Sequence, residues 1–239
     1  KSFFGFIFLT VSADILVRGA VGLAQRLNVS PLVIGVTIIS FGTSLPEFLV
    51  SMDAALIGTS AMALGNVVGS NLANMLLIVG VAAFLNPIHV KPFLLFRNTM
   101  VLLACSTLLI WFCWLGPVDR VQGGLFLLIM LIFLIYSYFN DFRKGGVSTE
   151  VHAGEIENFE GLKSLWQICF ALLGGLVGVI FGADLIVDGG VQMAQAFGVS
   201  DEVIGLTVFA IGTSLPELAA SVVAAMRGHV DLALGNVVG

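Results

Sequence analysis

Two glutamates of this sequence, Glu47 and Glu217, each follow a proline inside a long apolar stretch. The hexapeptide Gly-Thr-Ser-Leu-Pro-Glu carries both, at residues 42–47 and again at 212–217, so a threonine and a serine hydroxyl accompany each carboxylate. A carboxylate among apolar residues is costly unless it has a partner or a ligand. Carboxylate and hydroxyl oxygens suit hard cations such as sodium and calcium, whereas zinc and copper favour imidazole or thiolate ligands. The two hexapeptides therefore predict a cation site.

Pro46 should break the helix that carries Glu47. Proline has no backbone N–H and its ring clashes with the carbonyl four residues before it, so the helix should bend or unwind near Gly42 and free carbonyl oxygens. Inside a bilayer such a break is tolerated only where it is buried or lines a cavity. Helical spacing places several oxygen-bearing side chains on one face beside Thr43, namely Ser40, Ser44, Glu47 and Ser51. The second copy supplies Thr213, Ser214, Glu217 and Ser221, with Ala210 at the position of Ser40.

A stripe of two amides and one hydroxyl follows the first hexapeptide. Asn66, Ser70 and Asn74 are four residues apart, which places them on one face of a helix. For Ser70 and Asn74, which lie deeper in the apolar run, we predict ion binding. For Asn66, interhelical hydrogen bonding is an equal alternative. Gly65 and Gly69 predict a close helix contact beside this stripe.

The segment 14–69 recurs as 184–239 at a constant offset of 170, without a gap and with 29 identities in 56 positions. The chain therefore contains an internal duplication. The offset predicts Ser or another small oxygen-bearing residue at position 240, opposite Ser70, and Asn or Asp at position 244, opposite Asn74. The sequence starts without a methionine and stops within the second copy, so we expect it to be part of a longer protein.

Composition indicates the solvent of the chain. Hydrophobic residues make up 58% of 239 residues and charged residues only 10%, whereas a soluble domain is about one quarter charged. A helix needs about 20 apolar residues to cross a hydrocarbon core of ~30 Å. We therefore predict an all-α polytopic membrane protein. Its apolar spans lie near 3–25, 31–57, 61–85, 93–115, 121–139, 164–187 and 202–226, and an eighth begins near Asp231.

Basic residues predict how these spans are oriented. With the N-terminus outside, the outer loops hold only Lys1 and Arg120, so the positive-inside rule favours this orientation. An odd number of spans separates equivalent points of the two copies, so the second copy must enter the membrane from the opposite side. Inverted repeats with broken helices are typical of secondary transporters, whose site lies near the midplane and opens to each side in turn. The basic residues of the inner side are Arg26, Lys91, Arg97, Arg143, Lys144, Lys163 and Arg227.

These motifs resemble those of a known family. The two copies of Gly-Thr-Ser-Leu-Pro-Glu, with Gly-Asn-Val-Val-Gly-Ser-Asn at 65–71 and Gly-Asn-Val-Val-Gly at 235–239, are similar to the paired alpha repeats of the calcium:cation antiporter superfamily. They are most like the sodium/calcium exchangers of the compact prokaryotic type, and the resemblance covers nearly half of the chain. It implies a ten-helix fold of two inverted groups of five, of which about seven and a half spans are present here.

The chain is accordingly predicted to divide into two halves. Residues 1–139 form the first inverted-repeat half of five transmembrane helices, with the alpha-1 motif at 35–75. Residues 163–239 form a truncated second half, with the alpha-2 motif at 205–239. The linker 140–162 should be cytoplasmic and solvated rather than a calcium sensor, because it lacks the acidic spacing of a calcium-binding loop.

The resemblance also implies which residues coordinate the ions. Ser40 and Ala210 would contribute backbone carbonyls, and the two glutamates would serve both calcium and sodium. The side-chain ligands that it implies are Thr43, Ser44, Glu47, Ser70, Asn74, Thr213, Ser214 and Glu217.

The predicted function is secondary active antiport, in which calcium exchanges for sodium by alternating access to a midplane site. A proton- or potassium-coupled exchanger of calcium or another divalent cation is the alternative. A cation channel fits less well, because two carboxylates beside broken helices favour occlusion. No protease motif occurs, so we expect no enzyme activity, and no cofactor. The expected partners are calcium, sodium and the lipid bilayer of the cell membrane, with no nucleic acid, and the expected state is a monomer.

Several other residues of the spans are predicted to pack rather than to bind. Gly174, Gly178 and Gly182 form a small-residue ridge at helical spacing. Asp14 and Arg18 are four residues apart and predict an ion pair within a helix, whereas both counterparts in the second copy are acidic. The cysteines share no metal-ligand or redox spacing and should be small packing residues without a disulfide: Cys105, Cys113 and Cys169.

Overall fold

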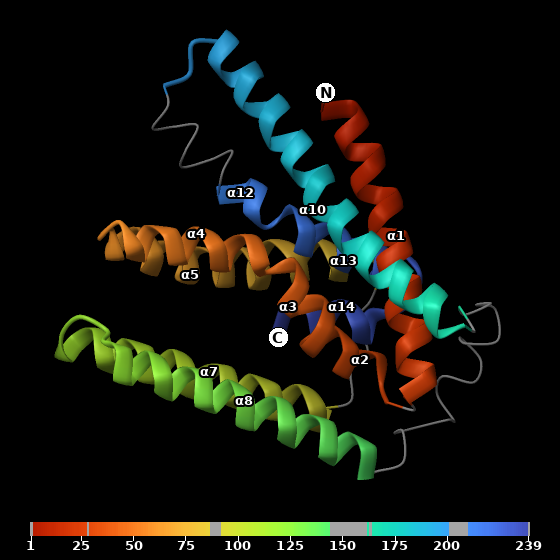
Figure 1. Ribbon diagram of the computed structural model, residues 1–239, viewed down its shortest axis with the longest axis horizontal. Helices are drawn as coiled ribbons and strands as arrows, with labels where there is room; N and C mark the ends of the chain where they lie inside the picture. The colour runs from red at the N-terminus through yellow and green to blue at the C-terminus, as the bar shows by residue number, and fades with distance from the viewer. Residues whose placement is uncertain are drawn as a thin grey trace.

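Long apolar runs that end at glycine, proline or asparagine fold into helices throughout the described part of the chain. The computed structural model describes residues 2–27, 29–86, 92–143, 162, 164–200 and 210–238, and no strand occurs among them (Figure 1). The α-helices are α1 (Ser2–Leu27), α2 (Pro31–Ile34), α3 (Ser40–Thr43), α4 (Leu45–Leu56), α5 (Ser60–Ala73), α6 (Val79–Leu85), α7 (Pro92–Leu115), α8 (Arg120–Arg143), α10 (Leu165–Ala196), α12 (Ala210–Thr213), α13 (Leu215–Met226) and α14 (Val230–Val238). Two π-helical segments, η1 (Gly35–Ile39) and η2 (Asn74–Ile78), interrupt them.

Five described helices are long and apolar enough to cross a membrane, and a bent pair, Pro31–Thr43 with Leu45–Leu56, adds a sixth if it is one span. The sixth predicted span is shorter than the helix that contains it. We expected it to end near 187, but α10 continues past the acidic residues Asp184 and Asp188 to Ala196. The helix ends before Gly198, whose φ of 75° only glycine adopts readily. Much of the predicted span 202–226 lies outside the described residues, which resume at Ala210.

The core forms where α1 packs lengthwise against α10, its counterpart in the second copy (Figure 1, red and cyan). Glycines on α10 allow this approach. A Cβ on Gly175 would lie 2.6 Å from the backbone nitrogen of Leu16, and one on Gly182 would lie 2.8 Å from the Cα of Leu9. Gly178 faces Ser12 in the same way. The predicted ridge therefore exists, but its first member is Gly175 and not Gly174, which has no described neighbour within 4 Å.

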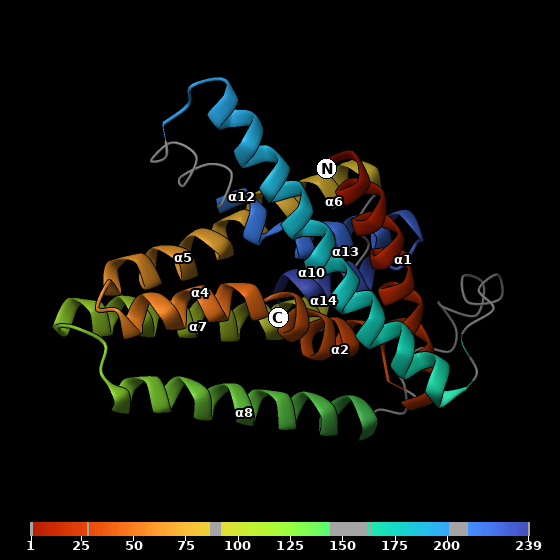
Figure 2. The ribbon, with the colours of Figure 1, turned by 45° about the horizontal axis from the view of Figure 1, so that its top comes forward.

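The two copies fold into equivalent helical hairpins, α4 with α5 and α13 with α14 (Figure 2). Gly58 and Gly228, which the offset pairs, both adopt positive φ, at 85° and 81°. In each turn an N–H bonds back to the end of the preceding helix, over 2.8 Å in both copies, from Thr59 to Ala54 and from His229 to Ala224. The duplication in sequence is thus a duplication in local structure.

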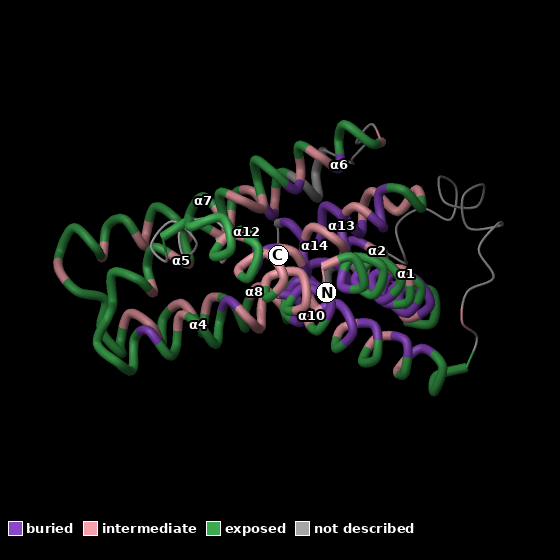
Figure 3. Tube along the Cα trace, turned by 90° about the horizontal axis from the view of Figure 1, so that it is seen from above, coloured by how far each residue is buried: buried purple, intermediate pink, exposed green. Residues whose placement is uncertain are grey.

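Burial differs strongly between parts of the molecule. Figure 3 shows buried residues concentrated in α1, α10, α13 and α14, whereas α4, α5, α7 and α8 are largely exposed. Many of the exposed side chains of these helices are large and apolar, and they include Trp114 at 87% and Leu56 at 78% exposure. Apolar surface of this extent is typical of helices that face lipid, as expected for a membrane protein.

Candidate cation site

The helix that carries Glu47 is broken, as the sequence predicts. Ser44 leaves helical geometry, with φ −84° and ψ 6°, and the segments Pro31–Thr43 and Leu45–Leu56 are bent by 47°. The second copy breaks at the equivalent residue, because Ser214, with φ −89° and ψ 2°, separates α12 from α13. Pro46 and Pro216 lie in the first turn of the new helices, where proline is well tolerated because its missing N–H has no partner to lose.

A π-helical segment precedes the first break. In η1 the backbone is wider than in an α-helix, and such segments are frequent at functional sites. Thr43 compensates for the irregular backbone, because its Oγ1 donates to the carbonyl of Ile39 over 3.0 Å and lies 3.4 Å from that of Ser40. The Ser40 carbonyl also accepts the N–H of Ser44 over 3.0 Å. These carbonyls therefore border the break.

The two hexapeptides meet where the serine of the first copy contacts the glutamate of the second. The Ser44 hydroxyl donates to Glu217 Oε1 over 2.9 Å. Ser44 and Glu47 are three residues apart, so they belong to adjacent turns of one broken helix. The hydrogen bond therefore brings the carboxylate of the second copy to the turn that precedes the carboxylate of the first. Both carboxylates are buried, with Glu47 exposed by 8% and Glu217 by 1%.

Several oxygens at this junction are buried without a hydrogen-bond partner, which is unusual for polar atoms in a folded protein. They are Glu47 Oε2, Glu217 Oε2 and Ser214 Oγ, and Asn74 Oδ1 is a further one on the neighbouring segment η2. A bound cation would satisfy such oxygens, because each offers lone pairs and a carboxylate has no proton to donate. Within the described ranges no three His, Cys, Asp or Glu residues gather, so the junction depends on two carboxylates and neutral oxygens.

The remaining predicted ligands lie on several different elements. Thr213 is half-buried, directly before the break at Ser214, and Ala210 is the first residue of α12. Ser70 is half-buried on α5, and its hydroxyl donates over 3.2 Å to Val67 of its own helix. The structure thus joins the two hexapeptides through Ser44 and Glu217, and Asn74 lies on η2, which packs against α13. Among the described residues, the Ser70 hydroxyl bonds to its own helix and not to the hexapeptides.

Asn66 makes interhelical hydrogen bonds, which was one of its two predicted roles. Its Nδ2 donates to the carbonyl of Glu47 over 3.0 Å and to Ser51 Oγ over 2.9 Å. Asn236, its counterpart, bonds in the same way to Glu217 and Ser221. This role of Asn236 was not predicted from the sequence. The constant offset of 170 could have identified it, because it pairs all three residues of one set with those of the other.

Glycines bring the two copies together beside this junction. A Cβ on Gly35 of η1 would lie 2.6 Å from the carbonyl of Leu232, and one on Gly235 of α14 would lie 2.5 Å from that of Leu32. The close helix contact predicted at Gly65 and Gly69 is not found among the described residues, because no described atom lies within 4 Å of a Cβ there. The contact forms instead at Gly235, the counterpart of Gly65.

Comparison with known proteins agrees with this geometry. The model of the family described as sodium/calcium exchanger protein matches residues 2–139 and 168–239, which is most of the chain and both copies of the motif. The chain belongs to the sodium/calcium exchanger family. It is 39% identical to CaxA of Alkalimonas amylolytica, over 98% of this chain and 73% of that protein. It is 32% identical to the sodium/calcium exchanger MaX1 of Methanosarcina acetivorans, over 98% of this chain and 76% of that protein.

The family's fold is also the fold of this chain. A solved structure of the sodium-calcium exchanger NCX_Mj, soaked with sodium and strontium, superposes with a TM-score of 0.83 and 34% sequence identity. The superposition covers all of this chain and 75% of that one. This family member is therefore a helical membrane protein that carries out cation-exchange antiport, as the inverted repeats and broken helices predicted.

Proposed function

We propose that this exchanger moves calcium in one direction and sodium in the other, through a shared site at the junction of the two hexapeptides. The hydrogen bond from Ser44 to Glu217 carries the proposal, because it joins a hydroxyl of one copy to the carboxylate of the other. The buried, unpartnered oxygens beside it support a cation as the missing partner. The names of the family and of MaX1 support calcium and sodium as those cations.

Each proposed ligand has a role that follows from its chemistry. Glu47 and Glu217 supply the charge, and the hydroxyl and amide oxygens complete the coordination of hard cations. The carbonyls of Ser40 and Ala210 contribute further neutral oxygens where the helices are broken. The hydroxyl and amide ligands are Thr43, Ser44, Ser70, Asn74, Thr213 and Ser214.

Exchange follows from the cost of burying two carboxylates. Two ionised, unpaired carboxylates in a low-dielectric site are strongly unfavourable, so the carrier without ions should not close and reopen on the other side. One calcium ion neutralises both charges, and so do two sodium ions. A third sodium ion could bind among the neutral oxygens at the cost of one net positive charge. Because both ions use the same carboxylates, one must leave before the other binds.

The setting of the site completes the proposal. We place the protein in the cell membrane as a monomeric transporter without enzyme activity or a cofactor, with its N-terminus outside and the segment 140–162 in the cytoplasm. That segment lies almost wholly outside the described residues. The excess of basic residues on the proposed inner side supports this orientation.

Flux in proteoliposomes tests the proposed function. Vesicles loaded with sodium and diluted into choline medium should take up radioactive calcium, and vesicles loaded with choline should not. A proton-coupled exchanger would instead respond to an imposed pH gradient with choline on both sides. A potassium-coupled exchanger would need potassium together with calcium. Calcium uptake that is indifferent to sodium would refute the proposal.

A further inference from the structure

A single buried amide, that of Asn236, bonds to both copies of the motif. Its Nδ2 donates to the carbonyl of Glu217 over 3.2 Å and to Ser221 Oγ over 2.9 Å, both on α13. Its Oδ1 accepts the hydroxyl of Thr43, on α3 of the other copy, over 3.2 Å. Asn236 is exposed by only 2% and Thr43 by 0%, so these bonds are shielded from bulk solvent.

The orientation of this amide is determined by its partners. A carbonyl oxygen such as that of Glu217 can only accept, so it requires the NH2 side of Asn236 to face it. The amide oxygen is thereby directed toward Thr43. If the amide were turned over, two oxygens would face each other in a buried site, which leaves both without a donor. The Asn236 side chain therefore fixes the direction of its own acceptor.

The neighbours of the Thr43 hydroxyl likewise determine where its proton points. It has one proton, and its described neighbours are acceptors: the carbonyls of Ile39 and Ser40, the amide oxygen of Asn236 and the carboxylate of Glu217. A hydroxyl that coordinates a cation must turn its proton away from the ion, and acceptors behind it make this orientation favourable. Ile39 and Ser40 belong to the same copy as Thr43. Asn236 and Glu217 belong to the other copy, and Asn236 bonds both to the Thr43 hydroxyl and to the backbone of Glu217.

We infer that Asn236 is a positioning residue for the ion site, which holds Thr43 of one copy in register with Glu217 of the other. The inference rests on the proposed function, since it concerns ligands of the same site. Asn236 itself need not touch the ion. Asn66 holds the turn of Glu47 through the same two kinds of donor bond, to the glutamate carbonyl and to a serine hydroxyl. The two amides thus fix each glutamate turn to the helix that follows it.

The chain offers a matched control for this inference. Asn86 also donates its Nδ2 to a backbone carbonyl of α13, that of Ala225, over 3.0 Å. The bond joins the end of α6 to α13, as the bond of Asn236 joins α14 to α13, but it lies at the far end of α13 from Glu217. Loss of either amide removes an interhelical hydrogen bond. Only loss of Asn236 should disturb the ion ligands.

The experiment compares Asn236→Ala, Asn86→Ala and the milder Ser221→Ala in the full-length protein. Sodium-driven calcium uptake into proteoliposomes is measured over a range of calcium and sodium concentrations, and thermal stability is measured in detergent. Loss of an outer-shell partner typically weakens metal binding roughly 10-fold or more, so Asn236→Ala should raise the half-saturating concentrations of both ions by at least that factor. Ser221→Ala, which removes one of two acceptors, should raise them by a smaller factor. Asn86→Ala should lower thermal stability and maximal rate with unchanged half-saturating concentrations.

The outcomes separate this inference from the function on which it rests. If the wild type shows no sodium-driven uptake, the proposed function fails and the inference fails with it. If the wild type transports and Asn236→Ala changes only stability and maximal rate, as Asn86→Ala does, then Asn236 is merely structural and the inference alone is overturned. If Asn236→Ala cannot be purified in a folded state, Ser221→Ala decides, and unchanged half-saturating concentrations in that variant overturn the inference.

Discussion

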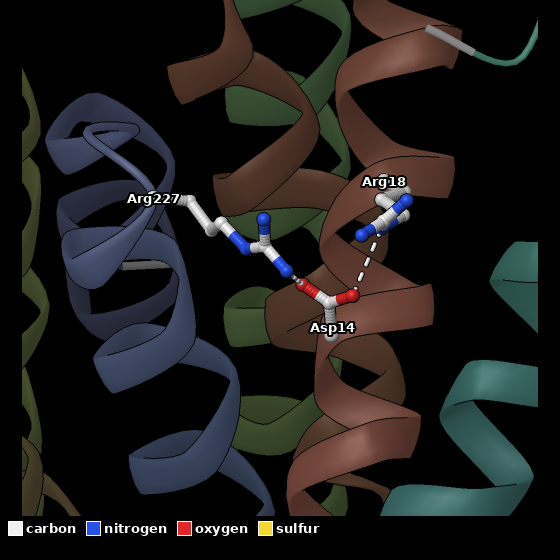
Figure 4. A network of polar contacts seen from close by, with 3 residues as sticks. All are labelled: Asp14, Arg18 and Arg227. Carbon is white, nitrogen blue, oxygen red and sulfur yellow. Dashed lines mark hydrogen bonds and ion pairs between the residues drawn. The ribbon is translucent and has the colours of Figure 1, made fainter. Parts of the chain in front are cut away.

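Asp14 on α1 and Arg227 at the end of α13 form an ion pair, with Oδ1 and Nη2 2.6 Å apart (Figure 4). Arg18 reaches the other oxygen of the same carboxylate, with Nε 2.9 Å from Oδ2, which confirms the ion pair predicted within α1. The duplication does not repeat this cluster. Asp184, the counterpart of Asp14, is followed by an acid, Asp188, at the position of Arg18, and the offset places an isoleucine opposite Arg227. The first copy therefore has an acid with an arginine four residues later, where the second copy has two acids, and the arginine that pairs with Asp14 across helices has no basic counterpart.

Arg227→Gln should lower thermal stability slightly. The pair is partly exposed, at 41% for Arg227 and 23% for Asp14, so it contributes about 1 kcal/mol at most. For a chain of this size such a loss corresponds to a fall in Tm of up to about 4 °C. Arg18→Gln is the control, because it leaves the link between α1 and α13 intact. Melting curves in detergent that show an equal loss in both variants would mean that the interhelical pair has no special role.

Glu47→Gln and Glu217→Gln should each abolish sodium-driven calcium uptake. Removal of one charge weakens binding of a divalent ion and leaves two sodium ions with one excess positive charge, which is costly in a buried site. Asp53→Asn is the matched control, because Asp53 is an exposed acid of α4 whose counterpart is valine. Uptake is measured in proteoliposomes at saturating calcium. Loss in only one glutamate variant would show that the two copies have divided their roles.

Gly175→Ala should destabilise the protein, and Gly174→Ala should not. A Cβ at 175 would lie 2.6 Å from the backbone of Leu16 and force α1 and α10 apart. Overpacking of this kind costs about 1–3 kcal/mol. At 174 no described atom lies within 4 Å, so alanine gains its better helix propensity without a clash. Thermal unfolding of both variants provides the measurement, and equal stability would contradict the close packing of these two helices.

The orientation can be tested with cysteines at opposite ends of α8. In a variant that lacks the three native cysteines, Val118→Cys lies between α7 and α8, and Ser148→Cys lies in the segment after α8. A maleimide that cannot cross the membrane should label the cysteine at 118 in intact cells and label that at 148 only after permeabilisation. The reverse pattern would mean that the chain is inserted with its N-terminus inside.

Local chemistry alone determined the break in each of the two helices that carry a hexapeptide. A proline removes one N–H and clashes with a carbonyl four residues away wherever the helix packs, so the irregular backbone at Ser44 and Ser214 could be predicted from Pro46 and Pro216. The duplication likewise determined the inverted repeat, because an odd number of spans reverses direction in any packing. The proposal of carboxylate and hydroxyl ligands followed from residue types.

Tertiary structure decided which residues meet. Helical periodicity places residues on one face but does not state what that face packs against, and one position rotates a side chain by about 100°. For this reason Gly174 was predicted as a member of the ridge on α10 in place of Gly175, although Gly178 and Gly182 were predicted correctly. The same limit applied to Arg227, which reaches Asp14 across 213 positions of the sequence. It applied also to Asn236, whose partners Thr43 and Glu217 come from opposite copies, because hydrogen bonds between helices depend on packing that no local pattern encodes.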